Sequence, residues 1–239
     1  MLFRSTILQS IRISCGDGLW VNAATSITVT PPANARVEIE GLVVEKASIH
    51  GILFNGQGEV IVSNTRVSKS ALHGLSFFPV GPSTLYVTDS AFENNAFNGI
   101  FVQPTGSGNA NVHMRNVKLL ANGINGLTGA GTNSTIGINI NIDDSVISGN
   151  VNDGIQANTT AAGNALTTIA VRNSTVSGNH VNGIRSTGQK SVVVVNGAMI
   201  NANFNGLLAA KNGQLLTYGN NQLLLNGTTG AFTGSVALQ

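Results

Sequence analysis

The sequence has little charge, few aromatic residues and almost no cysteine. Of its 239 residues, charged side chains make up 9% and aromatic side chains 5%, and Cys15 is the single cysteine. One cysteine excludes an intrachain disulfide and a metal site built from several thiolates. The 12 Lys and Arg and the 10 Asp and Glu are spread thinly, with no basic stretch interleaved with aromatic residues. We therefore expect no nucleic-acid partner, and nothing in the sequence indicates a cofactor.

Long hydrophobic runs are also absent. No apolar run approaches the roughly 18 residues that a membrane-spanning helix needs, and the longest β-branched run is Val192–Val195. The N-terminus has an early arginine, Arg4, but neither a long apolar segment nor a small-residue cleavage site, so no signal peptide is visible. The chain does have 42% hydrophobic residues and 29 glycines. It can therefore form a large core, beneath a surface made polar by Asn, Ser and Thr.

One pattern recurs along the chain, and Asn173–Gly183 is a clear copy of it. If Asn173 is position zero, an apolar residue stands at plus three, Asn at plus six and Gly at plus ten, followed by Ile or Leu. Position zero is held in successive copies by Gly41, Asn64, Asp89, Asn116, Asp144, Asn173 and Asn196. The glycines at 51, 74, 99, 126, 154, 183 and 206 are 23 to 29 residues apart. Periods of this length indicate a solenoid.

The apolar residues of each copy predict three short strands. Alternating pairs stand two and four residues before position zero: Val37/Ile39, Val60/Val62, Leu85/Val87, Val112/Met114, Ile140/Ile142, Ile169/Val171 and Val192/Val194. Such period-two alternation is typical of a strand with these side chains inward. Further inward positions are plus three, from Val44 to Met199, and the residue after each repeat glycine. The pattern predicts an all-β parallel β-helix of about eight or nine coils.

We expect one elongated domain. Residues 1–35 are predicted to form irregular first coils or a cap, 36–216 the regular coils, and 217–239 a last coil or cap. Length varies in one place per coil, which should put the variable loops on one side of the solenoid. These loops are 55–59, 79–84, 104–110, 129–135, 158–167, 187–190 and 211–213.

Two recurring polar positions have structural explanations. The plus-six residues Asn95, Asn122, Asn150 and Asn179 should stack at about 4.8 Å and bond to one another. The residue before each repeat glycine is His50, His73, Asn98, Asn125, Asp153, Asn182 or Asn205. We expect left-handed backbone there, followed by a glycine in a corner with no room for Cβ.

The repeats NSTVSGNHVNGI and DSVISGNVNDGI resemble those of bacterial right-handed parallel β-helix proteins of the pectin-lyase-like superfamily. The resemblance covers most of residues 36–216, and the tail 218–239 is similar to an uncharacterised bacterial subgroup. It implies a right-handed, single-stranded β-helix and a secreted or cell-surface location, without an activity.

Catalytic motifs of the better-known branches are not reproduced. Asp143-Asp144 matches the Asp-Asp of polygalacturonases, but His50-Gly51 and His73-Gly74 precede it, and two further elements of that family's pattern are missing. The Arg-x-Pro-x-x-Arg of pectate lyases and the Asp-Pro-His-Glu of alginate epimerases are absent. No catalytic residue can be carried over from the resemblance.

Candidate functional residues are therefore those that the repeat does not dictate. Outward positions of the alternating strand gather Tyr86, His113, Arg115, Asp143 and Arg172 on neighbouring coils. As a catalytic group, His113 or Arg115 could abstract a proton beside a sugar carboxylate that Arg172 binds, and Tyr86 could stack on a ring or protonate a leaving oxygen. As a structural group, the charges form a ladder worth less than about 1 kcal/mol per exposed pair.

A second group of residues is predicted to bind ligand: Glu59, Tyr86, Phe101 and Asn141. His50 and His73 lack a third ligand, so no metal site is predicted. The leading hypothesis is a non-catalytic protein that binds or displays polysaccharide at the bacterial surface. The alternative is a lyase or hydrolase acting on uronate-containing glycan, and the third is a purely structural or adhesive repeat. The sequence leaves the oligomeric state open.

Overall fold

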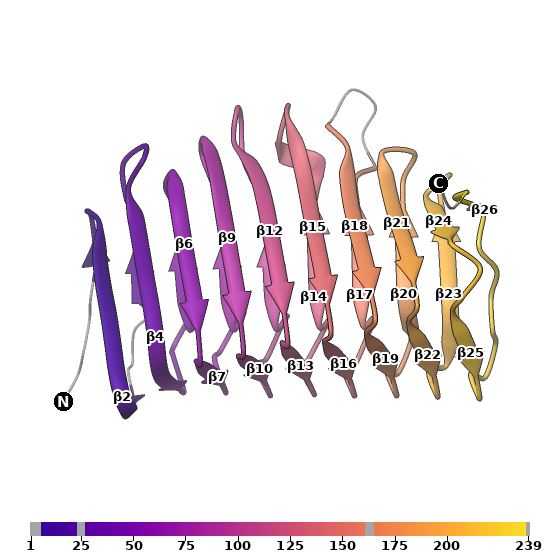
Figure 1. Cartoon of the computed structure of the whole chain (residues 1–239), viewed down its shortest axis with the longest axis horizontal. Helices are drawn as coiled ribbons and strands as arrows, with labels where there is room; N and C mark the ends of the chain where they lie inside the picture. Colours follow the sequence, from indigo (N-terminus) through magenta and orange to yellow (C-terminus); the bar gives the residue numbers. More distant parts are fainter. Residues whose placement is uncertain (1–5, 23–26, 161–164, 238–239) are drawn as a thin grey trace.

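A computed structural model describes residues 6–22, 27–160 and 165–237, with the side chains of 15–22, including Cys15, outside the description. The chain forms a solenoid whose coils lie side by side along one axis (Figure 1). All pairings between its strands are parallel within the described residues, and one sheet contains nine strands, one from each successive coil. The predicted β-helix is confirmed.

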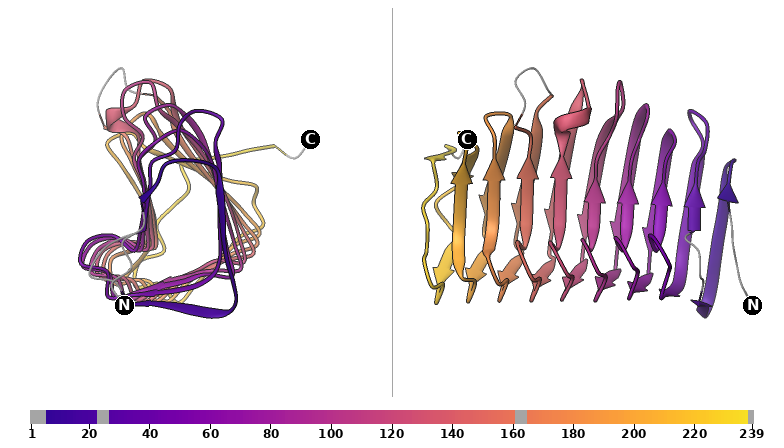
Figure 2. Two further views of the ribbon diagram at one scale, coloured as in Figure 1. Left: turned by 90° about the vertical axis from the view of Figure 1, so that its left-hand side faces the viewer. Right: turned by 180° about the vertical axis from the view of Figure 1, so that it is seen from behind.

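Each coil contributes one strand to this nine-stranded sheet. Its strands are β1 (Thr6–Ile7), β3 (Ile27–Val29), β5 (Ile52–Phe54), β8 (Leu75–Phe77), β11 (Ile100–Val102), β14 (Leu127–Ala130), β17 (Ile155–Asn158), β20 (Asn182–Thr187) and β23 (Asn205–Ala210). Viewed along the axis, the sheet lies on the left, between the loops at the top and the turns at the lower left (Figure 2).

The opposite side of the coil carries the long strands. They are β2 (Ile11–Asn22), β4 (Arg36–Glu45), β6 (Gly58–Ser63), β9 (Pro82–Thr88), β12 (Asn109–Arg115), β15 (Gly137–Asp143), β18 (Thr167–Arg172), β21 (Ser191–Asn196) and β24 (Gln214–Thr217). The loops between the nine-stranded sheet and the long strands lie at the top of Figure 1, and one contains the 3-10 turn Gly131–Asn133. No helix in the described ranges is long and apolar enough to cross a membrane.

Short strands close each coil after the long one. They are β7 (Arg66–Ser68), β10 (Ala91–Glu93), β13 (Lys118–Leu120), β16 (Val146–Ser148), β19 (Thr175–Ser177), β22 (Met199–Asn201) and β25 (Gln222–Leu224), with β26 (Gly234–Ser235) pairing beside β24. The first two coils differ from the prediction, because β2 and β4 each run on through the position of the short strand. The proposed division of the domain at residues 35 and 216 stays a prediction.

The core is a set of apolar columns that run along the axis. Val112, Ile140 and Ile169 are cross-strand neighbours and are fully buried. In the nine-stranded sheet, Phe54 and Phe77 stack with ring centroids 4.7 Å apart. Each such side chain contributes about 1.5 to 3 kcal/mol by leaving water, so the alternation read from the sequence accounts for most of the core.

The prediction for the last repeat is wrong by one residue. Asn196 pairs with Arg172, so Gly197 takes position zero, opposite Asn173. Val193 and Val195 are consequently buried, whereas Val192 and Val194 face outward. The inward residue at plus three is Ile200 and not Met199. A shift of one residue reverses every side chain of a strand, because the side-chain period is two.

Left-handed backbone occurs at position zero and not before the repeat glycine. Residues Gly41, Asn64, Asp89, Asn116, Asp144, Asn173 and Gly197 have φ between 46° and 71°. Asn, Asp and Gly tolerate this conformation best. None of the described residues predicted to be left-handed before the repeat glycine has positive φ. The glycines themselves are required, since a Cβ at Gly74 would stand 2.7 Å from the Gly99 carbonyl oxygen.

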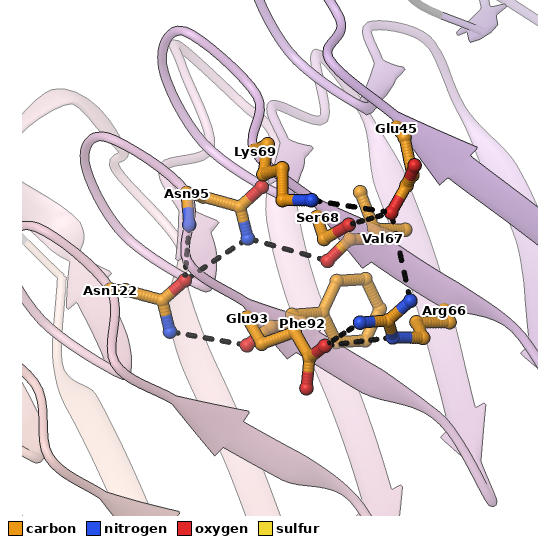
Figure 3. Close-up of polar contacts among 9 residues, drawn as sticks. All are labelled: Glu45, Arg66, Val67, Ser68, Lys69, Phe92, Glu93, Asn95 and Asn122. Carbon is orange, nitrogen blue, oxygen red and sulfur yellow. Dashed lines mark hydrogen bonds and ion pairs between the residues drawn. The ribbon is translucent and has the colours of Figure 1, made fainter. Parts of the chain in front are cut away.

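Asparagines stack inside the turn after the short strands. The Nδ2 of Asn95 donates to Oδ1 of Asn122 at 3.0 Å, and the contacts repeat through Asn150, Asn179, Asn203 and Asn226. Each Oδ1 also accepts a backbone N–H from the coil before, and each Nδ2 also donates to a carbonyl, as Asn122 does to Phe92 (Figure 3). The amides therefore satisfy one another where water is excluded.

Ion pairs reinforce the short strands on the outside. Arg66 bonds to Glu93 of the following coil and lies 3.6 Å from Glu45 of the preceding one, and Lys69 also approaches Glu45 (Figure 3). These groups are partly exposed, so each pair contributes about 1 kcal/mol or less. Their main effect is to favour one alignment of neighbouring coils, because shifted alignments separate the opposite charges.

We predict that Asn150→Ala lowers the free energy of unfolding by about 2 to 4 kcal/mol, because it leaves buried partners in two coils unsatisfied. Urea unfolding followed by circular dichroism measures the change. Asn139→Ala, on the exposed side of β15, is the matched control and should cost less than about 0.5 kcal/mol. Equal small losses in both variants would show that the stack contributes no more than surface amides do.

The corrected alignment of the last repeat predicts opposite outcomes at two adjacent residues. Ile200→Ala should cost about 2 to 5 kcal/mol because it opens a cavity in the core. Met199→Ala should cost less than about 0.5 kcal/mol, since Met199 is exposed. The same unfolding measurement distinguishes them, and the reverse order would restore Asn196 as position zero.

Candidate functional site

The predicted outward residues of the long strands are neighbours in the structure. His113 lies between Tyr86 and Asn141 in register. The rings of Tyr86 and His113 stack with centroids 5.1 Å apart and planes 16° from parallel. Their side chains are exposed. For His113 this follows from alternation along the strand, because its neighbours Val112 and Met114 are buried. This surface, here called the long-strand face, has an aromatic pair and two open hollows, one lined by Glu59, Thr84 and Asn111 and the other by Thr88, Arg115 and Asp144.

Charges on the long-strand face pair differently from the predicted ladder. Arg172 forms two hydrogen bonds to Asp143, at 2.6 and 2.9 Å. These bonds raise the pKa of the Arg172 guanidinium. Arg115, although aligned with Asp143, has its Nε 3.5 Å from the carboxylate of Asp144. The charged members of the predicted cluster are thus neutralised within the face.

The predicted ligand-binding residues divide between two faces. Glu59 is 2.7 Å from Arg36 at the edge of the long-strand face. Tyr86 and Asn141 flank His113, as described above. Phe101 lies on β11, on the outer side of the nine-stranded sheet, here called the nine-strand face. The structure therefore does not bring all four residues together.

Aromatic rings gather around Phe101. Its ring lies 4.7 Å from His73 and 5.6 Å from Phe78, measured between centroids. His73 also contacts Phe97 and stacks on His50, 5.4 Å away. The five rings form a partly buried cluster, the aromatic patch, in which edge and face contacts alternate as aromatic quadrupoles favour.

The two histidines of the aromatic patch are held neutral. Burial, with a smaller contribution from His50, lowers the pKa of His73 to about 4, and burial also lowers the pKa of His50. The Nδ1 of His73 accepts the backbone N–H of Asn98, and the Nδ1 of His50 is 2.8 Å from Ser76 Oγ. Among the residues described, no cluster of three or more His, Cys, Asp or Glu could hold a metal.

Polar side chains continue the same outward column toward the C-terminus. Phe101 neighbours Thr128, which neighbours Gln156, which neighbours Arg185. The Nδ2 of Asn125 donates to Thr128 Oγ1 at 2.8 Å and to Gln156 Oε1 at 3.2 Å. The nine-strand face therefore changes from aromatic to amide and guanidinium along one line.

Asp153 is the buried charge of the nine-strand face. It is completely buried, at the corner where β17 begins. Its Oδ1 accepts from Asn182 Nδ2 at 2.6 Å and its backbone N–H donates to Asn125. Its Oδ2 has no hydrogen-bond partner in the described chain, and Arg185 Nη1 is 3.7 Å away, too far for a hydrogen bond. Burial raises the pKa of the Asp153 carboxyl, although Asn182 and Arg185 oppose the shift.

This carboxylate departs from the column in which it stands. Asn125 and Asn182 occupy the same corner in the coils before and after. An amide both donates and accepts, whereas an ionised carboxylate only accepts, so Asp153 loses a link and retains a desolvated charge. A buried carboxyl of raised pKa beside a cation is a functional-site candidate. Sequence reasoning assigned Asp153 to the corner architecture, although the single acid among His and Asn residues was the available signal.

Comparison with known proteins agrees with the geometry. The model of the right-handed β-helix region matches residues 25–226. The chain belongs to the right-handed β-helix family. Its structure is similar to the A-module of a mannuronan C-5 epimerase from Azotobacter vinelandii, with a TM-score of 0.63 and 14% identity over 98% of this chain and 80% of the module. This likeness shows the shared fold. No curated protein matches the sequence.

We predict that Asp153→Asn raises the free energy of unfolding by about 1 kcal/mol at neutral pH, because the amide can donate the hydrogen bond that the carboxylate cannot. The pKa of Asp153 is higher in the folded chain than in the unfolded chain, so stability is lost as pH rises through the folded value. The advantage of Asp153→Asn should therefore shrink in acid. Urea unfolding at several pH values measures the difference in the free energy of unfolding between the wild type and Asp153→Asn. The contributions of the other titrating groups are the same in both proteins and cancel in this difference.

Asp144→Asn, at an exposed corner, is the control for Asp153→Asn and should change stability by less than about 0.5 kcal/mol. Destabilisation by Asp153→Asn at every pH would mean that the carboxylate is a structural acceptor, and the functional interpretation of Asp153 would be wrong.

Proposed function

We propose that this protein is a non-catalytic β-helix that binds linear polysaccharide along the nine-strand face. The observation that carries the proposal is one column of outward positions in which the aromatic patch is followed, past the buried Thr128, by the partly exposed Gln156 and Arg185. A sugar ring presents C–H groups on its faces and hydroxyls at its edge. Aromatic rings suit the first, and amide or guanidinium groups suit the second.

Two features of the chain support a polymer as the ligand. Neighbouring coils repeat about every 4.8 Å, so equivalent outward positions meet successive parts of an extended chain. The low charge content, 9%, gives a surface suited to many hydroxyl contacts. The structural neighbour is named as an enzyme of mannuronan, a polysaccharide. Binding or display at a bacterial surface, expected from the sequence resemblance, is part of the same proposal.

Asp153 favours an enzyme as the second candidate. A buried carboxyl beside Arg185 resembles the groups that lyases and hydrolases of uronate-containing glycans need, namely a proton-transfer group and a cation for the carboxylate. Catalytic roles for Tyr86, His113, Arg115, Asp143 and Arg172 stay predictions, with their ion pairs and exposure described above. A purely structural or adhesive repeat would show neither binding nor product.

A panel of polysaccharides, measured for binding by affinity electrophoresis and for reducing ends and unsaturated uronate, tests the proposal. We expect saturable binding without product, and Phe101→Ala should weaken it about tenfold, or 1.4 kcal/mol. Release of product would establish the enzyme instead, and His113→Ala with unchanged turnover would then remove the catalytic role of His113.

Tyr86→Ala is the matched control for Phe101→Ala, because it removes an aromatic ring from the long-strand face. It should leave binding unchanged. Equal losses in both variants, or greater loss from Tyr86→Ala, would move the ligand to the long-strand face. Thermal unfolding of each variant confirms that the fold is retained.

A further inference from the structure

We propose that Asp153 controls an anion site at Arg185, which takes an anionic group of the ligand when Asp153 is neutral and releases it when Asp153 is ionised. The inference rests on the proposed function, since it concerns the same face and the class of saccharide that the face accepts. It adds an acidic sugar as the ligand and proton uptake as the control.

The geometry places Arg185 between Asp153 and solvent. The side chain of Asp153 is fully buried, whereas that of Arg185 is 31% exposed. The Nε of Arg185 donates to Thr187 Oγ1 at 3.0 Å, which fixes the plane of the guanidinium. Nη1 approaches Asp153 at 3.7 Å without a hydrogen bond. The guanidinium thus keeps N–H groups for a ligand in front, with a titratable charge behind.

The neighbouring strands leave Arg185 and Asp153 as an isolated charge pair. On β17 the outward residue is Gln156, on β14 it is Thr128 and on β23 it is Leu208. The corner residues above and below Asp153 are Asn125 and Asn182. Among the described residues, Arg185 is the single charged group that shifts the pKa of Asp153. The local charge is therefore +1 with Asp153 neutral and zero with Asp153 ionised.

Gln156 adds a second donor to the same site. Its Oε1 accepts from Asn125 at 3.2 Å, which turns the Nε2 end of the amide away from that contact. Arg185 is its cross-strand neighbour. A guanidinium beside an amide N–H matches the two oxygens of a carboxylate or of a sulfate ester. The shared chemistry is an oxyanion on a sugar.

The direction of the pH dependence follows from burial. Burial raises the pKa of Asp153, so the neutral form persists to a higher pH than for an ordinary aspartate. Affinity for an anion should increase as pH falls through this value. By linkage, a bound anion should raise the pKa of Asp153 further. His73 also titrates in acid, with a pKa of about 4, but it lies three coils away, about 14 Å at the strand spacing.

Isothermal titration with galacturonate, inorganic sulfate and, as a neutral control, galactose tests the site on the full chain. As pH falls from about 8 to about 4, we expect affinity for the two anions to rise about tenfold. Protonation of Asp153 removes a negative charge that repels the bound anion from behind the guanidinium. The Asp153→Asn variant should bind both anions tightly at both pH values. The Arg185→Gln variant should bind neither anion at either pH. Galactose should show no such dependence.

Three results would overturn the proposal: no anion binding at either pH, the wild-type pH dependence in Asp153→Asn, or wild-type affinity in Arg185→Gln. Carbon NMR of the Asp153 carboxyl in the wild-type chain gives an independent test without a substitution. Sulfate should raise the pKa of this carboxyl, and an unchanged titration would contradict the control. A response to one anion alone identifies carboxylate or sulfate as the source.

The polymer experiments separate this inference from the proposed function. Polysaccharide binding lost in Phe101→Ala, with no pH dependence for galacturonate or sulfate, supports the binding face and contradicts control by Asp153. Conversely, pH-dependent anion binding without affinity for any polysaccharide supports the anion site and contradicts the proposed function.

Discussion

Parallel pairing of each coil with the next is the constraint on which the rest of this structure depends. It aligns every side chain with its counterparts about 4.8 Å above and below, so a position in the repeat becomes a column. Apolar columns such as Val112, Ile140 and Ile169 are stable in the core without hydrogen-bond partners for their side chains. A polar column inside the turn is stable only if its members bond to one another, and like charges in a column repel.

The asparagine stack follows from this constraint. An amide accepts from one coil and donates to the next, so the contact can repeat without end, as from Asn95 to Asn226. The second polar column, before the repeat glycine, is less uniform. Two histidines begin it by stacking their rings, and amides continue it. At Asp153 the column contains a group that cannot donate when ionised.

Sequence reasoning predicted the columns well and their interactions poorly. Spacing alone identifies the strands, the inward residues and the corner at Asn64 or Asp89, because these depend on local periodicity. It failed in the last repeat, since Asn196 and Gly197 both suit a left-handed corner. The segment between Asn203 and Gly206 is one residue shorter than the segment between Asn179 and Gly183. Counting from Asn196 therefore still reaches Gly206 at the expected plus ten, which concealed the shift.

The candidate site was harder to predict for physical reasons. Alternation places Arg115 and Asp143 in one column. The arginine side chain is long and flexible enough to pair with other nearby carboxylates, and Arg115 lies beside Asp144 at the corner. Alternation also separates inward from outward without measuring how deeply a turn is covered. Thr128 and Asp153 are on the outer side of the coil and are nevertheless buried. Burial there depends on the neighbouring corner residues, which periodicity does not describe.

In a repeat protein, each residue can be compared with the residues at the same position of the other coils, and an unusual residue stands out by this comparison. Tyr86 and His113 are unusual in their column, yet they are exposed and stack on one another, so their presence costs the fold little. Asp153 is unusual where an asparagine would complete a hydrogen-bonded column, and among the described residues its buried Oδ2 has no hydrogen-bond partner, only Arg185 at 3.7 Å. Functional sites often contain groups that lower stability, because activity or binding can need a strained or desolvated group. The loss of a bond that the repeat would otherwise supply is therefore the stronger sign of function, and it points to the nine-strand face.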